Sequence, residues 1–215
     1  MNWPELKARL AARLDPLGTD AEEAGQSDFD LNPGWRAAAA EQGRAAVLAP
    51  IVERPEGPTM LLTRRAEAMT RHAGQIAFPG GRLETGESAE AAALREAEEE
   101  IGLAPERVTL LGRSSAYRTV TGFAITPVVG IVTPPFNLTL NRAEVSEAFE
   151  VPLAVVLDAD RYERRFQEFD SGRRYFYAVA HDERVIWGAT AGMLRALRAR
   201  LLGEPLVEAD LRGAA

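Results

Sequence analysis

Apolar positions recur with the period of a helix in three places along this chain. At the N-terminus, Leu6, Leu10 and Leu14 occupy every fourth position, which predicts a short amphipathic helix. A longer helix is expected at residues 87–101 and a last one at residues 190–202.

The middle helix, residues 87–101, has an alanine-rich first half and an acidic second half. Leu94, Ala97 and Ile101 lie at helical spacing and are predicted to face the core. Gly102 follows at a position where a left-handed residue commonly ends a helix. We therefore expect the helix to end at Ile101.

Apolar runs bounded by turn residues predict the strands. A Pro-Glu-Gly-Pro turn at residues 55–58 joins two runs into a predicted hairpin, and residues 181–183 form the turn of another. Residues 144–151 fit either a helix or a loop. Strands on both sides of a central helix, with a late helix, predict an α/β protein with a mixed sheet between helices. The expected strands are residues 45–52, 59–64, 75–78, 108–112, 125–132, 174–180 and 184–187.

The chain divides by pattern into three parts. Residues 1–43 form an N-terminal helix and linker extension, residues 44–203 the main domain and residues 204–215 a weakly patterned tail. Within the extension, residues 15–34 are rich in Pro, Gly and acidic residues and are expected to be loop. The extension is either disordered or a helix that packs on the core or on a second subunit.

Composition limits the classes of function. The 215 residues include no cysteine, which excludes thiol nucleophiles, disulfides and cysteine-ligated zinc. The net charge of −7 argues against a nucleic-acid partner, and Lys7, the single lysine, argues against a Walker-type lysine. No stretch resembles a secretory signal or a membrane span. These features predict a cytoplasmic location without membrane contact.

The acidic half of the middle helix is the strongest candidate for chemistry. Seven Glu and one Arg lie between Glu84 and Glu100, and like charges on one helix repel each other. Glu96, Glu99 and Glu100 are spaced to share a helix face, which favours a divalent cation such as Mg²⁺. Arg95 lies four residues before Glu99 and can orient its carboxylate.

Two glycines, Gly80 and Gly81, precede this helix and allow the backbone to approach a ligand or a metal closely. The N-terminus of the helix that follows favours negative charge. A pyrophosphate requires such backbone donors together with a cation, and a carboxylate can then help to supply the nucleophile.

The spacing of these residues resembles the Nudix box of the Nudix hydrolases. The family pattern is G-x5-E-x7-R-E-U-x-E-E-x-G-U, where U is apolar, and the chain matches it at every position from Gly81 to Leu103. The alternative, a solvated acidic helix face, does not account for the loop glycine, the arginine and the terminal glycine in one register. The resemblance implies a Nudix-type α/β/α sandwich with a mixed sheet between helices, and a pyrophosphohydrolase activity.

Residues 61–81 resemble the additional motif of the coenzyme A pyrophosphatase branch of this family. That pattern is roughly L-L-T-x-R-[SA]-x3-R-x3-G-x3-F-P-G-G, and one position departs from it. Thr70 stands where the second arginine is expected, and Arg71 follows one place later. The resemblance implies hydrolysis of coenzyme A or acyl-CoA to a phosphopantetheine and adenosine 3′,5′-bisphosphate, with Mg²⁺ or Mn²⁺ required.

The resemblance also implies roles for single residues. Glu96, Glu99, Glu100 and the carbonyl of Gly81 are the implied metal ligands, and Arg95 is the residue that orients them. The general base is implied to be either a box glutamate or an acidic residue on a distant loop. The candidate catalytic residues are Glu99, Glu100, Arg95 and Glu144.

Glu144 and Glu147 both lie in a segment that can form this distant loop, and we favour Glu144 as the base. Arg64 and Arg65 are candidates to meet the extra phosphate of coenzyme A, although a solvated strand end explains them equally well. The full set of candidate substrate-binding residues is Arg64, Arg65, Arg71, His72, Gly80 and Gly81.

Two other functions remain open at this point. One is a broader pyrophosphatase acting on nucleoside diphosphates such as ADP-ribose. The other is a non-catalytic Nudix module that binds a nucleotide and regulates a partner. The expected partner is a small-molecule diphosphate in either enzymatic case, and a homodimer is left open.

Overall fold

The computed structural model describes residues 3–19, 25–38, 43–70, 72–170 and 172–204. In this part of the chain, nine strands form a large sheet with the central order β1-β7-β8-β2-β3-β4, while β5, β6 and β9 pair with β2, β8 and β3. The strands of this sheet are β1 (Gln26–Ser27), β2 (Gly43–Val52), β3 (Thr59–Arg65), β4 (Ile76–Ala77), β5 (Gly80–Arg82), β6 (Val108–Arg113), β7 (Tyr117–Arg118), β8 (Phe123–Val132) and β9 (Val145–Pro152).

A second sheet and several helices complete the described fold. The second sheet is an antiparallel meander of three strands. Its strands are β10 (Tyr162–Phe169), β11 (Gly172–His181) and β12 (Arg184–Trp187), and the α-helices are α1 (Trp3–Arg13), α2 (Asp28–Leu31), α3 (Ala89–Ile101), α4 (Leu153–Leu157) and α5 (Ala189–Leu202). No described helix has the length and apolar character needed to cross a membrane.

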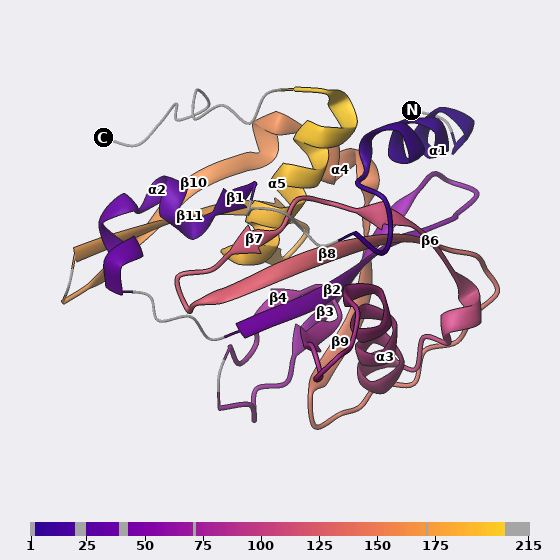
Figure 1. Ribbon diagram of the computed structural model, residues 1–215, viewed down its shortest axis with the longest axis horizontal. Helices are drawn as coiled ribbons and strands as arrows, with labels where there is room; N and C mark the ends of the chain where they lie inside the picture. Colours follow the sequence, from indigo (N-terminus) through magenta and orange to yellow (C-terminus); the bar gives the residue numbers. More distant parts are fainter. Residues whose placement is uncertain (1–2, 20–24, 39–42, 71, 171, 205–215) are drawn as a thin grey trace.

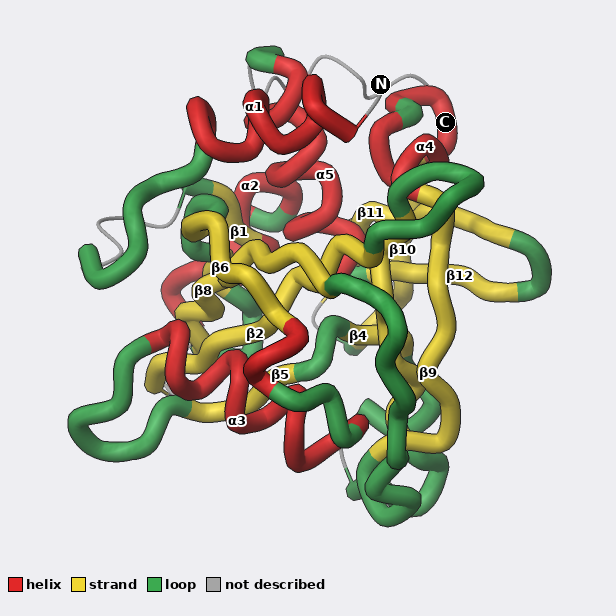
Figure 2. The backbone as a smooth tube through the Cα atoms, turned by 90° about the vertical axis from the view of Figure 1, so that its right-hand side faces the viewer, coloured by secondary structure: helices red, strands yellow, loops and turns green. Residues whose placement is uncertain are grey.

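The large sheet is mixed and lies between helices, as the sequence predicts. β2 runs parallel to β8 and antiparallel to β3 and β5. Alternate side chains of β2 point to opposite faces, so Ala46 and Leu48 join the core under α3, whereas Val47 and Ala49 join the core shared with α1 and α5. Figures 1 and 2 show α3 on one side of the sheet and α1 and α5 on the other.

Several local expectations are wrong. Residues 144–151, expected as a helix or loop, contain β9, which pairs antiparallel with β3. The acidic segment at residues 15–34, which the sequence predicts as loop, contains β1 and α2. Leu94 is only half-buried, because the small residues Ala93 and Ala97 carry the inward face of α3. The whole of β10 went unrecognised, since its mostly exposed positions give no buried alternation.

The N-terminal extension is joined to the core. Leu6 and Leu10 of α1 are fully buried in the cluster that includes α5. The carboxylate of Glu90 on α3 accepts two hydrogen bonds from Arg113 on β6, at 2.7 and 2.6 Å, and one from the backbone N–H of Gly18 at 2.9 Å. For α1, the alternative that holds is a helix packed on the core.

The Glu90–Arg113 pair predicts a pH-dependent part of the stability. Both side chains are largely buried, and the hydrogen bonds from Arg113 lower the pKa of Glu90 from 4.5 to about 2. A carboxyl group whose pKa is lowered by folding stabilises the native state above its unfolded pKa, and this contribution is lost as the pH falls toward 2. We expect Glu90→Gln to lower the free energy of unfolding by about 2–4 kcal/mol at pH 7, with the deficit shrinking below pH 4.5.

Urea unfolding of the wild type and the variant at several pH values measures this deficit. Glu98→Gln is the matched control, because Glu98 is exposed on the same helix, and it should change stability little. A deficit of equal size at pH 7 and pH 3 would show that the charge of Glu90 does not contribute.

Candidate active site

The site is built on two glycines that bring β5 against both the sheet and α3. A Cβ atom on Gly80, whose φ is +156°, would lie 2.4 Å from the carbonyl oxygen of Ala46 on β2. A Cβ atom on Gly81 would lie 2.4 Å from Oε1 of Glu96. The backbone N–H of Gly80 donates to Oε2 of Glu100 at 3.1 Å. The absence of side chains at both positions therefore places backbone directly beside the helix carboxylates.

Helix α3 is held in register at both of its ends. The hydroxyl of Ser88 caps its N-terminus by accepting from the N–H of Ala91. Gly102 ends it in the left-handed conformation with φ +67°, as the sequence predicts, and a Cβ there would lie 2.9 Å from the backbone of Thr139. These two caps fix which residues of the helix face β5.

Arg95 links the carboxylates of this helix to the loop before it. Its guanidinium donates to Glu87 at 2.9 and 3.0 Å, to Glu96 at 2.9 Å and to Glu99 at 3.1 Å. It also donates to the carbonyl of Arg82 on β5 at 3.2 Å. One cation thus partly neutralises three anions that would otherwise repel one another.

Two of the carboxylates lie where burial disfavours their charge. The Glu100 side chain is only 4% exposed, and burial raises its pKa to about 7, opposed by the Gly80 N–H and by Arg65. Burial likewise raises the pKa of Glu96, against the opposing effect of Arg95. Both pKa values are also raised by the nearby charge of Glu144. A cation beside these groups would favour their ionised forms.

The two candidates for a distant base differ in their surroundings. Glu144 lies in a turn tied to α3, because the N–H of Asn141 donates to the carbonyl of Glu100 at 2.9 Å and its amide donates to the Glu144 carboxylate at 3.1 Å. Glu147 instead forms ion pairs with Arg184 and Arg64, which lower its pKa. Glu144 is therefore the better placed of the two to accept a proton near α3.

A cleft of about 490 Å³ opens beside the glycines. Four of the sequence-predicted substrate residues line it: Arg65, His72, Gly80 and Gly81. Arg64 does not line it and donates instead to Glu147 and to the carbonyl of Gly74. Arg71 lies outside the described residues.

The other walls of the cleft come from residues that the sequence analysis did not assign to substrate binding. Apolar surface comes from Phe78, Phe123, Ile125, Trp187 and Met193, and polar groups come from Asp28, Thr119, Thr121, Gln167 and Arg174. Asp28 and Arg174 are distant in sequence from the motif and from each other, so no spacing could reveal their proximity. The cleft thus joins both sheets and the N-terminal segment.

The donor set fits a hard divalent cation. The oxygens of Glu96, Glu99, Glu100 and the Gly81 carbonyl are the ligand type that Mg²⁺ and Mn²⁺ prefer, and Gly81 leaves the space that the Glu96 carboxylate occupies. Within the described residues, no three acidic or histidine side chains already converge as a metal site. The Glu99 side chain is 58% exposed and turned to Arg95, so binding a cation requires it to change partners.

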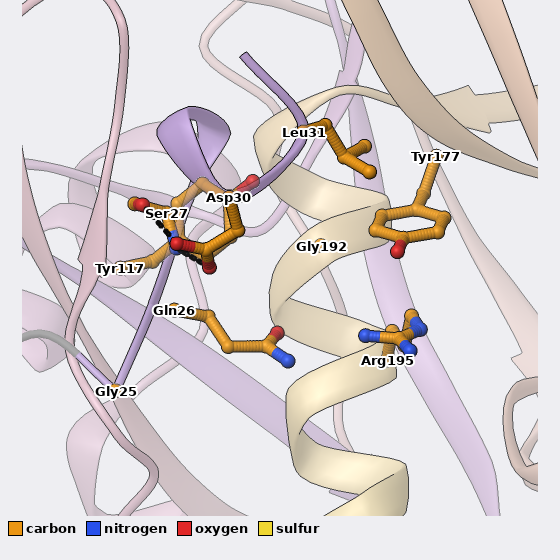
Figure 3. Close-up of a pocket in the computed structure, with 9 residues that line it drawn as sticks. All are labelled: Gly25, Gln26, Ser27, Asp30, Leu31, Tyr117, Tyr177, Gly192 and Arg195. Carbon is orange, nitrogen blue, oxygen red and sulfur yellow. Dashed lines mark hydrogen bonds between the residues drawn. The ribbon is translucent and has the colours of Figure 1, made fainter. Parts of the chain in front are cut away.

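A second pocket, of about 330 Å³, lies beside α5 (Figure 3). In it, the N–H and hydroxyl of Ser27 both donate to the Asp30 carboxylate at 2.8 Å, and Gly192 leaves space for the ring of Tyr117. Its lining residues are Gly25, Gln26, Ser27, Asp30, Leu31, Tyr117, Tyr177, Gly192 and Arg195. None of these belongs to the glycine loop or to the acidic helix, so this pocket is separate from the candidate site.

Comparison with known proteins agrees with this geometry. The family model described as NUDIX domain matches residues 43–171. Similar relatives include the Nudix hydrolase NudL of Cronobacter sakazakii, 40% identical over 176 residues covering 81% of this chain and 91% of the relative. NudL of Escherichia coli K12 is 43% identical over 165 residues, covering 75% of this chain and 84% of the relative.

A solved structure shares the fold. The Nudix hydrolase RenU of M. smegmatis superposes with a TM-score of 0.54 at 23% identity, covering 79% of this chain and 91% of RenU. The chain belongs to the Nudix hydrolase family, whose members are pyrophosphohydrolases.

The two glycines are expected to respond differently to a methyl group. Gly80→Ala should destabilise the fold by about 2–4 kcal/mol, because its Cβ would meet the backbone of β2 at a positive φ. Gly81→Ala should displace the flexible Glu96 carboxylate, so we expect near-native stability but at least about 10-fold weaker Mn²⁺ binding.

Thermal unfolding and Mn²⁺ titration calorimetry separate these effects. Gly34→Ala is the control, since a Cβ there meets no atom of the described residues within 4 Å. Unchanged Mn²⁺ affinity in a folded Gly81→Ala protein would contradict the assignment of Glu96 as a ligand.

Proposed function

We propose that this Nudix hydrolase cleaves the diphosphate linkage of coenzyme A or acyl-CoA, with Mg²⁺ or Mn²⁺ as cofactor. The observation that carries the proposal is that one wall of the cleft comes from the stretch that suggests the substrate. Residues 65–81, which belong to the stretch resembling the coenzyme A pyrophosphatase motif, supply Arg65, His72, Gln75, Phe78 and the two glycines to that wall. The segment that hints at the substrate therefore lies beside the segment that carries the acidic helix.

The residues of the chain divide the chemistry between them. Arg65 binds and orients the diphosphate, since a guanidinium suits phosphate oxygens. The absence of side chains at Gly80 and Gly81 lets the diphosphate approach the helix carboxylates closely. Glu144 takes a proton from the attacking water as the new P–O bond forms and the bond to the leaving phosphate breaks. Glu96, Glu99 and Glu100 would hold the divalent cation, which would offset the negative charge that develops on the phosphate oxygens.

The products of this reaction are a phosphopantetheine, acylated where the substrate was, and adenosine 3′,5′-bisphosphate. A broader activity on ADP-ribose is the main competitor, because Thr70 replaces the motif's second arginine. Hydrolysis of a panel of diphosphates with Mg²⁺ distinguishes the two. Turnover of ADP-ribose with none of coenzyme A would refute the proposed substrate, and binding without any turnover would indicate a non-catalytic module.

The proposed roles of the acidic residues predict how single Glu→Gln substitutions change the activity. Glu100→Gln should lower kcat by about 10²-fold or more, because it removes an implied ligand, and Glu144→Gln should lower it by about 10²-fold, because it removes the base. Glu147→Gln should keep most of the activity, since its carboxylate is occupied by two arginines.

Steady-state kinetics at saturating Mg²⁺ measure these losses. The pair Glu144→Gln and Glu147→Gln is matched in chemistry and lies in one segment of the chain. Loss of activity in Glu147→Gln with retention in Glu144→Gln would reverse the assignment of the base.

A further inference from the structure

One end of the cleft is cationic, and it includes Arg174, which lies outside the residues 43–171 matched by the Nudix model. Arg174 on β11 lines the cleft together with Arg82, Thr119 and Thr121. Arg82 stacks on the ring of Phe123, with its guanidinium carbon 4.8 Å from the ring centroid. Asp28 of α2 also lines this end. Helix α2 and the acidic helix α3 lie on opposite sides of the large sheet (Figure 2).

A buried carboxylate from the N-terminal segment holds Arg174 in place. Asp28 is 6% exposed and accepts from the Tyr117 hydroxyl at 2.8 Å, from the Val120 N–H at 2.8 Å and from Arg174 at 3.2 Å. The bonds from Tyr117 and Val120 hold one carboxylate oxygen each, so Asp28 is a fixed acceptor for the Arg174 guanidinium. The side chain of Arg174 is 25% exposed, and its ion pair with Asp28 engages only some of its five donors.

The backbone beside Arg174 is fixed by the same segment. Asn32 donates to the carbonyl of Tyr175 at 2.8 Å and accepts from its N–H at 2.7 Å. Asn32 is itself buried and also donates to the carbonyl of Asp28. The N-terminal segment therefore holds the side chain of Arg174 through Asp28 and the backbone next to Arg174 through Asn32. These contacts are additional to the strand pairing of β11.

Arg64, which lies in the motif at residues 61–81, is not placed to contact a ligand in this cleft. Arg64 is engaged by Glu147 and does not line the cleft, whereas Arg174 does. Two arginines and two hydroxyls with one carboxylate leave this end with a net positive charge. Guanidinium groups with free donors beside hydroxyls suit a phosphate monoester, which can accept several hydrogen bonds at once.

We propose that Arg174, positioned by Asp28, binds a phosphate monoester that the substrate carries outside its scissile diphosphate. This inference rests on the proposed diphosphate hydrolysis and deepens it, because it selects diphosphates whose nucleoside half bears an additional phosphate. Asp28 acts as a positioning residue and does not touch the substrate.

Kinetics on coenzyme A and 3′-dephospho-CoA, which differ only in that phosphate, test the inference. Arg174→Gln should reduce kcat/KM for coenzyme A at least about 10-fold more than for the dephosphorylated compound, mainly through KM. Asp28→Asn should shift the ratio in the same direction by a smaller factor, with thermal unfolding recorded to confirm its fold. Arg173→Gln is the matched control, because Arg173 is exposed, pairs with Glu168 and does not line the cleft, so it should leave the ratio unchanged.

Equilibrium binding of adenosine 3′,5′-bisphosphate and of adenosine 5′-monophosphate gives a readout that needs no turnover. The wild type should prefer the bisphosphate, and Arg174→Gln should lose most of that preference. Equal binding of both nucleotides by the wild type, or an equal loss for both in the variant, would overturn the inference. Absence of coenzyme A hydrolysis alongside a retained preference would instead refute only the proposed substrate.

Discussion

Crowding of carboxylates on α3 is the constraint on which the rest of the site depends. Glu96 and Glu100 lie in surroundings that disfavour their charge, and Glu99 and Glu87 add further negative charge nearby. Arg95 offsets part of this repulsion by contacting three of them, and Gly80 contributes a backbone donor to the fourth. The structure therefore keeps a concentration of negative charge next to a cleft. This charge attracts a divalent cation and repels a polyanionic substrate until such a cation is bound.

The sequence predicted the parts of the fold whose signals are local. The helices at both ends of the core, the two hairpins and the glycine at position 102 follow from periodicity and turn chemistry, and the mixed sheet between helices is present. The segment of β9 was missed because both of its faces carry a carboxylate, Glu147 on one and Glu150 on the other. Both carboxylates form ion pairs with arginines from other segments. Such pairing is a tertiary property that a local pattern does not contain.

The candidate site likewise has one part that local sequence spacing predicts and one part that depends on the tertiary fold. Its acidic helix and glycine loop were found from fixed spacing within one stretch, and the structure brings Arg65, His72, Gly80 and Gly81 to one cleft. Asp28 and Arg174 are 146 positions apart, and each looks like an ordinary surface charge in the sequence. Their contact depends on the parallel pairing of β1 with β7 and on the packing of α2 against β11, neither of which a motif encodes.

The turn at Asn141 joins Glu144 to the end of α3, so the candidate base and the carboxylates belong to one mechanical unit. The opposite wall, with Gln167 and Arg174, belongs to the three-stranded sheet. Under the proposed assignments, bond cleavage and recognition of the additional phosphate are carried by different sheets of the molecule. Substitutions in the β10–β11 hairpin are then expected to change which diphosphates bind without altering bond cleavage.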